Sequence, residues 1–210
     1  MDYTLTLDIK PEDLEVINGA QQKIALAKPV GNSKVDVIWV AFDPFESNTI
    51  QWSEDYWIYA STASVGTNGE KISKLSEVQP GPATDAMLYD FTNNATFSDP
   101  TKSDDVNLGT FAAKNNMSYG KYKALTFGLA QSAQVNQKIQ ERQPISASSV
   151  LATQQIQITP FTHVYIWLEA HFESSTIVTD ISGIKSVAKF GGETTEIEMT
   201  YDGKSGTFSA

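Results

Sequence analysis

Apolar and polar residues alternate along much of the chain with a period of two. In residues 3–9, every second side chain is apolar, beginning with Tyr3, and the intervening ones are polar. Successive side chains of a β-strand point to opposite faces of the sheet, so this pattern predicts a strand with one buried face. Residues 11–14, Pro-Glu-Asp-Leu, are expected to form a turn or a single helical turn after it.

Short segments of strand type continue to the C-terminus. Residues 35–42 are apolar on both faces apart from Asp36, which is typical of a central strand. Residues 61–83 are rich in Ser, Gly and Pro and predict a long surface excursion. Further strands are expected at residues 49–52, 56–60, 86–91, 123–129, 154–158, 163–172, 175–179, 184–190, 196–201 and 207–209. Within 123–129, Gly128 leaves room for a neighbouring backbone.

Residues 130–143 have two interpretations. Their Ala and Gln content favours a short helix by propensity, but only Val135 and Ile139 would form its apolar stripe. The weak stripe favours a strand or an extended loop, with a helix as the alternative.

The strand pattern as a whole predicts the fold class. Turn-forming pairs at Ser182-Gly183, Gly191-Gly192 and Asp202-Gly203 indicate antiparallel hairpins. A set of strands this long splits into two packed sheets rather than staying flat. We therefore expect an all-β protein with little helix, an antiparallel β-sandwich of jelly-roll or immunoglobulin-like architecture. Because no segment has the composition and length of a linker, residues 1–210 are expected to form a single domain.

Composition narrows the classes of partner. The 210 residues contain no Cys, which excludes disulfide scaffolds and thiol chemistry. The net charge is −10 and Arg142 is the only arginine, so we expect no nucleic-acid partner. No apolar stretch is long enough for a signal peptide or a membrane span. The chain is expected to be soluble, either cytoplasmic or secreted as a mature form, and the sequence does not separate these compartments.

Motifs for catalysis are sparse. The two histidines, His163 and His171, lie too far apart on one strand to share a metal ion, and no Gly-x-Ser-x-Gly motif occurs. We expect no enzymatic activity, no metal and no cofactor. The acidic residues Glu46, Glu54 and Asp55 lie near aromatic residues, which leaves a carbohydrate-active enzyme as an alternative.

Aromatic residues provide the candidate binding site. Residues 54–59 resemble, in residue types alone, the aromatic clusters with which β-sandwich lectins hold ligands. In residues 163–172, one face is apolar and the other carries His, Tyr, Trp and Glu. Such a face can stack on a sugar or anchor a partner, but it can equally form a semi-buried second layer. The candidate ligand-binding residues are Trp52, Trp57, Tyr59, Tyr165, Trp167 and Glu169.

These features predict a non-catalytic recognition protein of lectin-like or toxin-like type. It would bind a glycan or a cell-surface or membrane target through an aromatic-acidic patch. Residues 145–158 alternate in the manner of a pore-forming hairpin, which would insert after oligomerisation. A self-assembling structural protein, a homo-oligomer joined through strand edges, is the alternative from another class.

Overall fold

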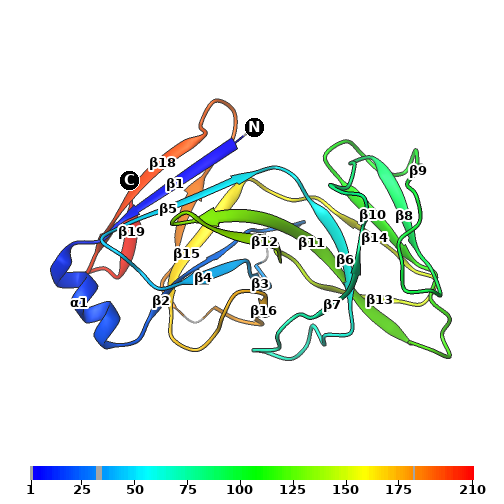
Figure 1. Cartoon of the computed structure of the whole chain (residues 1–210), viewed down its shortest axis with the longest axis horizontal. Helices are drawn as coiled ribbons and strands as arrows, with labels where there is room; N and C mark the ends of the chain where they lie inside the picture. The colour runs from blue at the N-terminus through cyan, green and yellow to red at the C-terminus, as the bar shows by residue number, and fades with distance from the viewer. Residues whose placement is uncertain (1, 32–34, 182) are drawn as a thin grey trace.

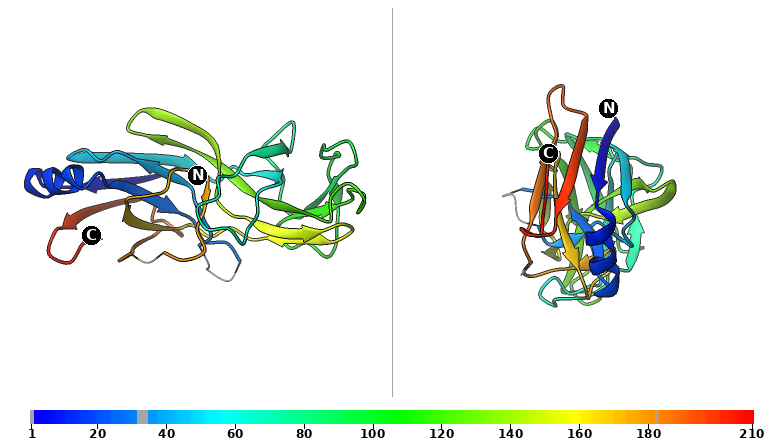
Figure 2. Two further views of the ribbon diagram at one scale, coloured as in Figure 1. Left: turned by 90° about the horizontal axis from the view of Figure 1, so that it is seen from below. Right: turned by 90° about the vertical axis from the view of Figure 1, so that its left-hand side faces the viewer.

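The computed structural model describes residues 2–31, 35–181 and 183–210, which fold into an elongated molecule built almost entirely of strands (Figures 1 and 2). Strands make up 49% of the chain and helix 4%, and several multi-stranded sheets pack together. The prediction of an all-β, sandwich-like fold with little helix is therefore confirmed.

The largest sheet runs along most of the molecule. Its nine strands are β1 (Asp2–Asp8), β5 (Ser47–Ser53), β6 (Trp57–Ser61), β7 (Lys74–Glu77), β11 (Ala124–Val135), β12 (Lys138–Pro144), β13 (Ser148–Leu151), β18 (Glu196–Asp202) and β19 (Thr207–Ser209). The strand order is β19-β18-β1-β5-β11-β6-β7, and β12 and β13 also pair with β11. The long strand β11 therefore connects the two ends of the sheet.

Three smaller sheets complete the fold. One contains β14 (Gln155–Ile158), β10 (Phe111–Asn115), β8 (Met87–Phe91) and β9 (Thr101–Lys102), in that order. A second contains β17 (Ser186–Lys189), β15 (His163–Glu169), β2 (Lys23–Ala27) and β4 (Val40–Phe42), and the third pairs β16 (Thr176–Ile177) with β3 (Val37–Ile38). The sheet with β8 and β9 lies at the opposite end of the molecule from helix α1 (Pro11–Gly19) (Figure 1).

Two strand pairs depart from the predicted antiparallel arrangement. Strand β1 pairs with β18 in parallel, with Leu5 opposite Ile197, and β10 pairs with β8 in parallel. Parallel strands are joined by a long crossover and not by a tight turn, so no turn motif in the sequence predicts their pairing. The other named pairs are antiparallel.

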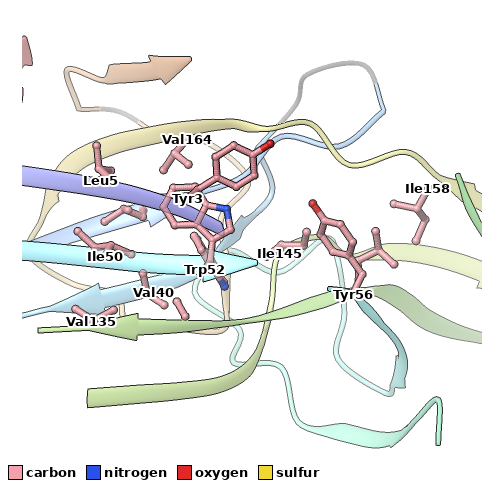
Figure 3. Packing of buried hydrophobic residues seen from close by; sticks show 14 of the residues in the cluster. Tyr3, Leu5, Val40, Ile50, Trp52, Tyr56, Val135, Ile145, Ile158 and Val164 are labelled. Atoms are coloured by element: carbon pink, nitrogen blue, oxygen red, sulfur yellow. The ribbon is translucent and has the colours of Figure 1, made fainter. Parts of the chain in front are cut away.

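The main core lies between the large sheet and the sheet that contains β15. Leu5 from β1 and Ile50 from β5 are fully buried, and they face Val164 of β15 (Figure 3). The alternation predicted for residues 3–9 is confirmed, because the inward residues of β1 are buried and the outward ones are partly or fully exposed. The same hydrophobic cluster continues to Phe91 and Phe111 in the end sheet.

Three predicted segments need correction. Residues 35–42 do not form one central strand, because the chain changes partners at Trp39: β3 pairs with β16, and β4 is the edge strand beside β2. Their burial comes from packing between layers, which sequence alone does not separate from a central position. Residues 11–14 belong to a longer helix of 9 residues, α1. The excursion at 61–83 contains β7, and Ile72 and Val78 within it are buried.

Residues 130–143 are extended, as the weak apolar stripe indicated. They form the end of β11, a tight turn and β12. Asn136 and Gln137 in the turn have φ values of 47° and 67°. Positive φ at both central residues matches the two-residue turns whose twist suits a β-hairpin. The helical alternative is therefore wrong.

The glycine and turn predictions have mixed outcomes. A Cβ at Gly128 would lie 1.8 Å from the carbonyl oxygen of Ser146, which confirms the close backbone approach. Asp202-Gly203 joins the antiparallel strands β18 and β19, as predicted. At Gly191-Gly192, an isolated antiparallel bridge pairs Gly191 with Thr194, but β17 and β18 on either side belong to different sheets. Ser182 lies outside the described residues, so the Ser182-Gly183 turn is not characterised.

Candidate functional site

The six candidate residues lie in separate packed regions. Trp52, Tyr59 and Trp167 are 4%, 0% and 3% exposed, and each belongs to a different hydrophobic cluster. The other three, Trp57, Tyr165 and Glu169, are half-buried. The structure therefore does not bring the six together into one aromatic surface.

Trp57 and Tyr59, the two candidate residues on β6, make close contacts with other parts of the protein. The hydroxyl of Tyr59 donates a hydrogen bond of 2.7 Å to the carbonyl oxygen of Ser146, and burial raises the pKa of Tyr59 well above 10.0. The guanidinium carbon of Arg142 lies 5.9 Å from the ring centroid of Trp57. A Cβ at Gly81 would lie 1.9 Å from Nε1 of Trp57, so backbone covers this indole closely.

Trp52 lies in the main core. Its ring stacks on Tyr3 at a centroid distance of 5.6 Å, and Figure 3 shows both among the apolar side chains. Its Nε1 donates a 3.2 Å hydrogen bond to Oε1 of Glu54. A ligand cannot stack on this indole unless the core opens.

Of the candidate residues on β15, Tyr165 and Glu169 are half-buried, whereas Trp167 is buried. Trp167 and Tyr165 pack against β2 and β3, so they form the semi-buried second layer that was the alternative interpretation. Nε1 of Trp167 donates a 3.0 Å hydrogen bond to Oε2 of Glu169. Oε1 of Glu169 accepts a 2.9 Å bond from the backbone nitrogen of His171. The carboxylate is thus held in one orientation where β15 ends.

A cavity of about 360 Å³ lies beside this carboxylate, and we name it the β15 groove. Of its polar lining residues, Asn68, His171 and Asp180 are exposed, and Gln22 and Glu169 are half-buried. The lining residues are Gln22, Asn68, Trp167, Leu168, Glu169, Ala170, His171, Phe172, Val178, Asp180, Ile181 and Gly183. Two of the six candidate residues, Trp167 and Glu169, therefore share a cavity.

The β15 groove combines hydrogen-bonding groups with aromatic rings. Each carboxylate oxygen of Glu169 accepts one bond from the protein and can accept a second from a ligand. Asp180 adds another carboxylate, and Gln22 and Asn68 add amide groups. The rings of His171 and Phe172 lie 6.4 Å apart between centroids and give the groove an apolar surface.

Sequence reasoning missed most of this groove. His171 was placed on the polar face of residues 163–172 but was not among the candidate ligand-binding residues, and Gln22, Asn68 and Asp180 come from turns and segment ends that no period marks. The 3.0 Å bond from the backbone nitrogen of Thr179 to Oδ1 of Asn68 joins the 61–83 segment to the residues that follow β16. Such a contact between distant segments leaves no local signal in the sequence.

The described residues also bear on metal binding and on membrane spanning. No group of three or more His, Asp or Glu side chains in residues 2–31, 35–181 and 183–210 could hold a metal ion. Over the same ranges, no helix has both the length and the apolar character needed to cross a membrane.

Comparison of the chain with protein-family models, with curated proteins and with solved structures found no match.

Proposed function

We propose that this protein is a non-catalytic recognition protein that binds a glycan in the β15 groove. The observation that carries the proposal is the oriented carboxylate of Glu169 in a cavity with further polar groups and two aromatic rings. Binding sites for small polar ligands are concave, with a few fixed polar groups among apolar ones. A sugar presents hydroxyls to carboxylates and amides, and it presents its C–H face to a ring.

A second cavity provides a contrast. It has a volume of about 470 Å³ and is lined in part by Phe42, Phe45, Asp43 and the two lysines Lys23 and Lys138. This cavity also has the oxygen acceptors of Asp43, Asn136 and Gln140, so it offers both donors and acceptors. The β15 groove is preferred because two hydrogen bonds from the protein hold the carboxylate of Glu169 in one orientation there.

The glycan proposal is better supported than a membrane-inserting one. Ile145, Val150 and Ile158 in the 145–158 segment are buried in the main core. Strand β13 pairs with β11, and β14 pairs with β10. Insertion of this segment would require both pairings and the buried contacts to be lost.

The test is a glycan array probed with the wild-type chain and with single variants. We expect binding to at least one glycan, a loss of at least tenfold in affinity in His171→Ala and Asp180→Asn, and no change in Phe45→Ala, which alters the other cavity. No binding to any glycan would overturn the proposal. Binding to lipid vesicles with dye leakage would favour a membrane target instead. Hydrolysis of a bound glycan that is lost in Glu169→Gln or Asp180→Asn would show an enzyme.

A further inference from the structure

The main core contains a fully buried lysine that the proposed glycan site does not use. Lys28 follows β2, and its side chain is 0% exposed. Its Nζ lies 5.5 Å from the ring centroids of Trp39, Trp52 and Tyr56. Burial lowers the pKa of Lys28 to about 8, although the contact with Glu54 raises it. With this pKa, about one molecule in ten carries the neutral, nucleophilic amine at pH 7, and about half do at pH 8.

The lysine amine touches an amide and a carboxylate at the same time. Nζ of Lys28 lies 2.8 Å from Oε1 of Gln131 and 3.0 Å from Oε1 of Glu54. Gln131 lies on β11 and is also 0% exposed. Its Nε2 donates a 2.6 Å hydrogen bond to the carbonyl oxygen of Ser53, which fixes the amide plane. Nζ of Lys28 therefore contacts the oxygen that is bonded directly to Cδ, the carbonyl carbon of Gln131.

Glu54 is held in place by two aromatic side chains. Its Oε1 accepts a hydrogen bond from Nε1 of Trp52, and its Oε2 accepts one from the hydroxyl of Tyr56. Burial, with the charge of Glu54, raises the pKa of Tyr56, so this hydroxyl stays protonated and keeps donating. The carboxylate thus remains beside Nζ of Lys28 and can exchange protons with it.

We propose that Lys28 and Gln131 join in an intramolecular isopeptide bond, with Glu54 transferring the protons. Glu54 takes a proton from the ammonium of Lys28, and the free amine attacks Cδ of Gln131. The protonated Glu54 donates to the carbonyl oxygen as the tetrahedral intermediate forms, and it takes the second Nζ proton. The C–Nε2 bond then breaks as Nε2 takes a proton from Glu54 and leaves as ammonia. As the carbonyl re-forms, the hydroxyl proton passes to Glu54 and then to the ammonia, which departs as ammonium and restores the carboxylate.

The surroundings favour this condensation. The amine and the amide are held in contact, which replaces an encounter between separate groups. The rings of Trp39, Trp52 and Tyr56 around Nζ shield the amine from water that would hydrate it and the new amide from water that would hydrolyse it. The side chain of Glu54 is 26% exposed, so the ammonia has a route to solvent on that side. A chain without cysteine would thereby gain a covalent link between residues 103 positions apart.

The experiment lets the wild-type chain fold, denatures it, and measures its intact mass by mass spectrometry. Peptide mapping then locates any mass change. We expect a mass below the sequence mass by one ammonia, and one branched peptide that contains both Lys28 and Gln131. Succinimide formation at Asn18-Gly19 or Asn68-Gly69 also releases ammonia, so the map must place the loss. A wild-type chain with the full sequence mass after prolonged incubation near pH 8, or a loss mapped to Asn-Gly, would overturn the bond.

Three variants separate the roles of the residues. Lys28→Met removes the nucleophile at similar volume, and Glu54→Gln removes the proton carrier, so both should show the full sequence mass. Lys23→Met is the matched control, because Lys23 pairs with Glu173 at the surface, and it should still lose one ammonia. Ammonia loss between Lys28 and Gln131 in Glu54→Gln would overturn the role of Glu54. The wild-type peptide map decides on the bond even if the core variants do not fold.

Discussion

Trp52 with Glu54, and Trp167 with Glu169, repeat one local arrangement in two regions of the molecule. In each, a tryptophan near a strand end donates its Nε1 hydrogen to the carboxylate two residues later, over 3.2 Å and 3.0 Å respectively. Both indoles are buried. The carboxylates differ: Glu54 faces the buried amine of Lys28, whereas Glu169 faces the β15 groove.

The difference shows that the surroundings, and not the local motif, decide what a carboxylate does. At Glu54, distant segments contribute Lys28, Trp39 and Gln131, and the amine that the carboxylate contacts is fully buried. Charge interactions around a buried amine are stronger than in water, and this favours proton transfer between Glu54 and Lys28. At Glu169, the chain turns away after β15 and leaves the carboxylate beside a cavity, where it can bind a ligand.

The largest effect is expected from Lys28→Met. A link that closes a loop of about 100 residues restricts the unfolded chain, by roughly 4 to 5 kcal/mol in the chain-entropy model. The variant should therefore unfold at a much lower guanidinium concentration than the wild type. Lys23→Met, which breaks a surface ion pair, should change the free energy of unfolding by about 1 kcal/mol or less. If the wild type and Lys28→Met unfolded at the same guanidinium concentration, this would contradict a covalent link between Lys28 and Gln131.

The two tryptophans give a matched pair of substitutions. Trp52→Phe removes a donor to Glu54 inside the core and should destabilise by about 2 to 3 kcal/mol. Trp167→Phe removes the equivalent donor beside a cavity where water can replace it, and about 1 kcal/mol is expected. Denaturant unfolding measures both. If Trp167→Phe cost as much as Trp52→Phe, the two environments would not differ as described.

The pH dependence of stability sharpens the comparison, because an isopeptide-bonded lysine no longer titrates. In Gln131→Met the amine stays free, with a folded pKa near 8 against 10.5 in the unfolded chain. Between these values the unfolded chain binds a proton that the folded chain has released, so the free energy of unfolding should rise with pH. About 2 kcal/mol is expected between about pH 8 and about pH 9.5, below the ionisation of free tyrosine.

The wild type is the control for this pH series. Its linked Lys28 has no titratable amine in either state, so the rise attributed to Lys28 should be absent. Urea unfolding at each pH gives both curves. A wild-type curve with the same slope as Gln131→Met would show that the amine of Lys28 is free.

The smallest effect on stability is expected from Glu169→Gln. The amide oxygen can accept only one of the bonds from Trp167 and the backbone of His171, which go to different carboxylate oxygens, and water can replace the other, so a change of less than about 1 kcal/mol is expected. Affinity for the glycan found on the array should fall about tenfold or more, because one acceptor becomes a donor. Titration calorimetry measures the affinity. Unchanged affinity would place the ligand elsewhere.

Local patterns predicted much of the fold and little of the sites. The alternation around Leu5 gave β1, because one face of that strand is buried and the other is not. The parallel pairing of β1 with β18 could not be foreseen, since it depends on a crossover through most of the chain. Residues 35–42 were misplaced because an apolar strand at a sheet edge can be as buried as a central one.

The candidate sites show the same limit. Trp167 and Glu169 were found because an aromatic residue and a carboxylate share one strand. Lys28 was missed because, beside Pro29, it resembles any polar residue at the end of a strand. Gln131 was missed among the other Gln and Ala residues of β11. Lys28 and Gln131 meet through tertiary packing that joins the end of β2 to a residue 103 positions away on β11, which no local period records.

The central claim is that the carboxylate in the core serves a covalent link whereas its counterpart at the groove does not. A high-resolution crystal structure of the wild-type chain tests it most directly. We expect continuous electron density from Nζ of Lys28 to Cδ of Gln131, with no Nε2 atom beside the carbonyl oxygen of Ser53. Two separate side chains, with a complete amide on Gln131 at hydrogen-bonding distance from Nζ of Lys28, would contradict it.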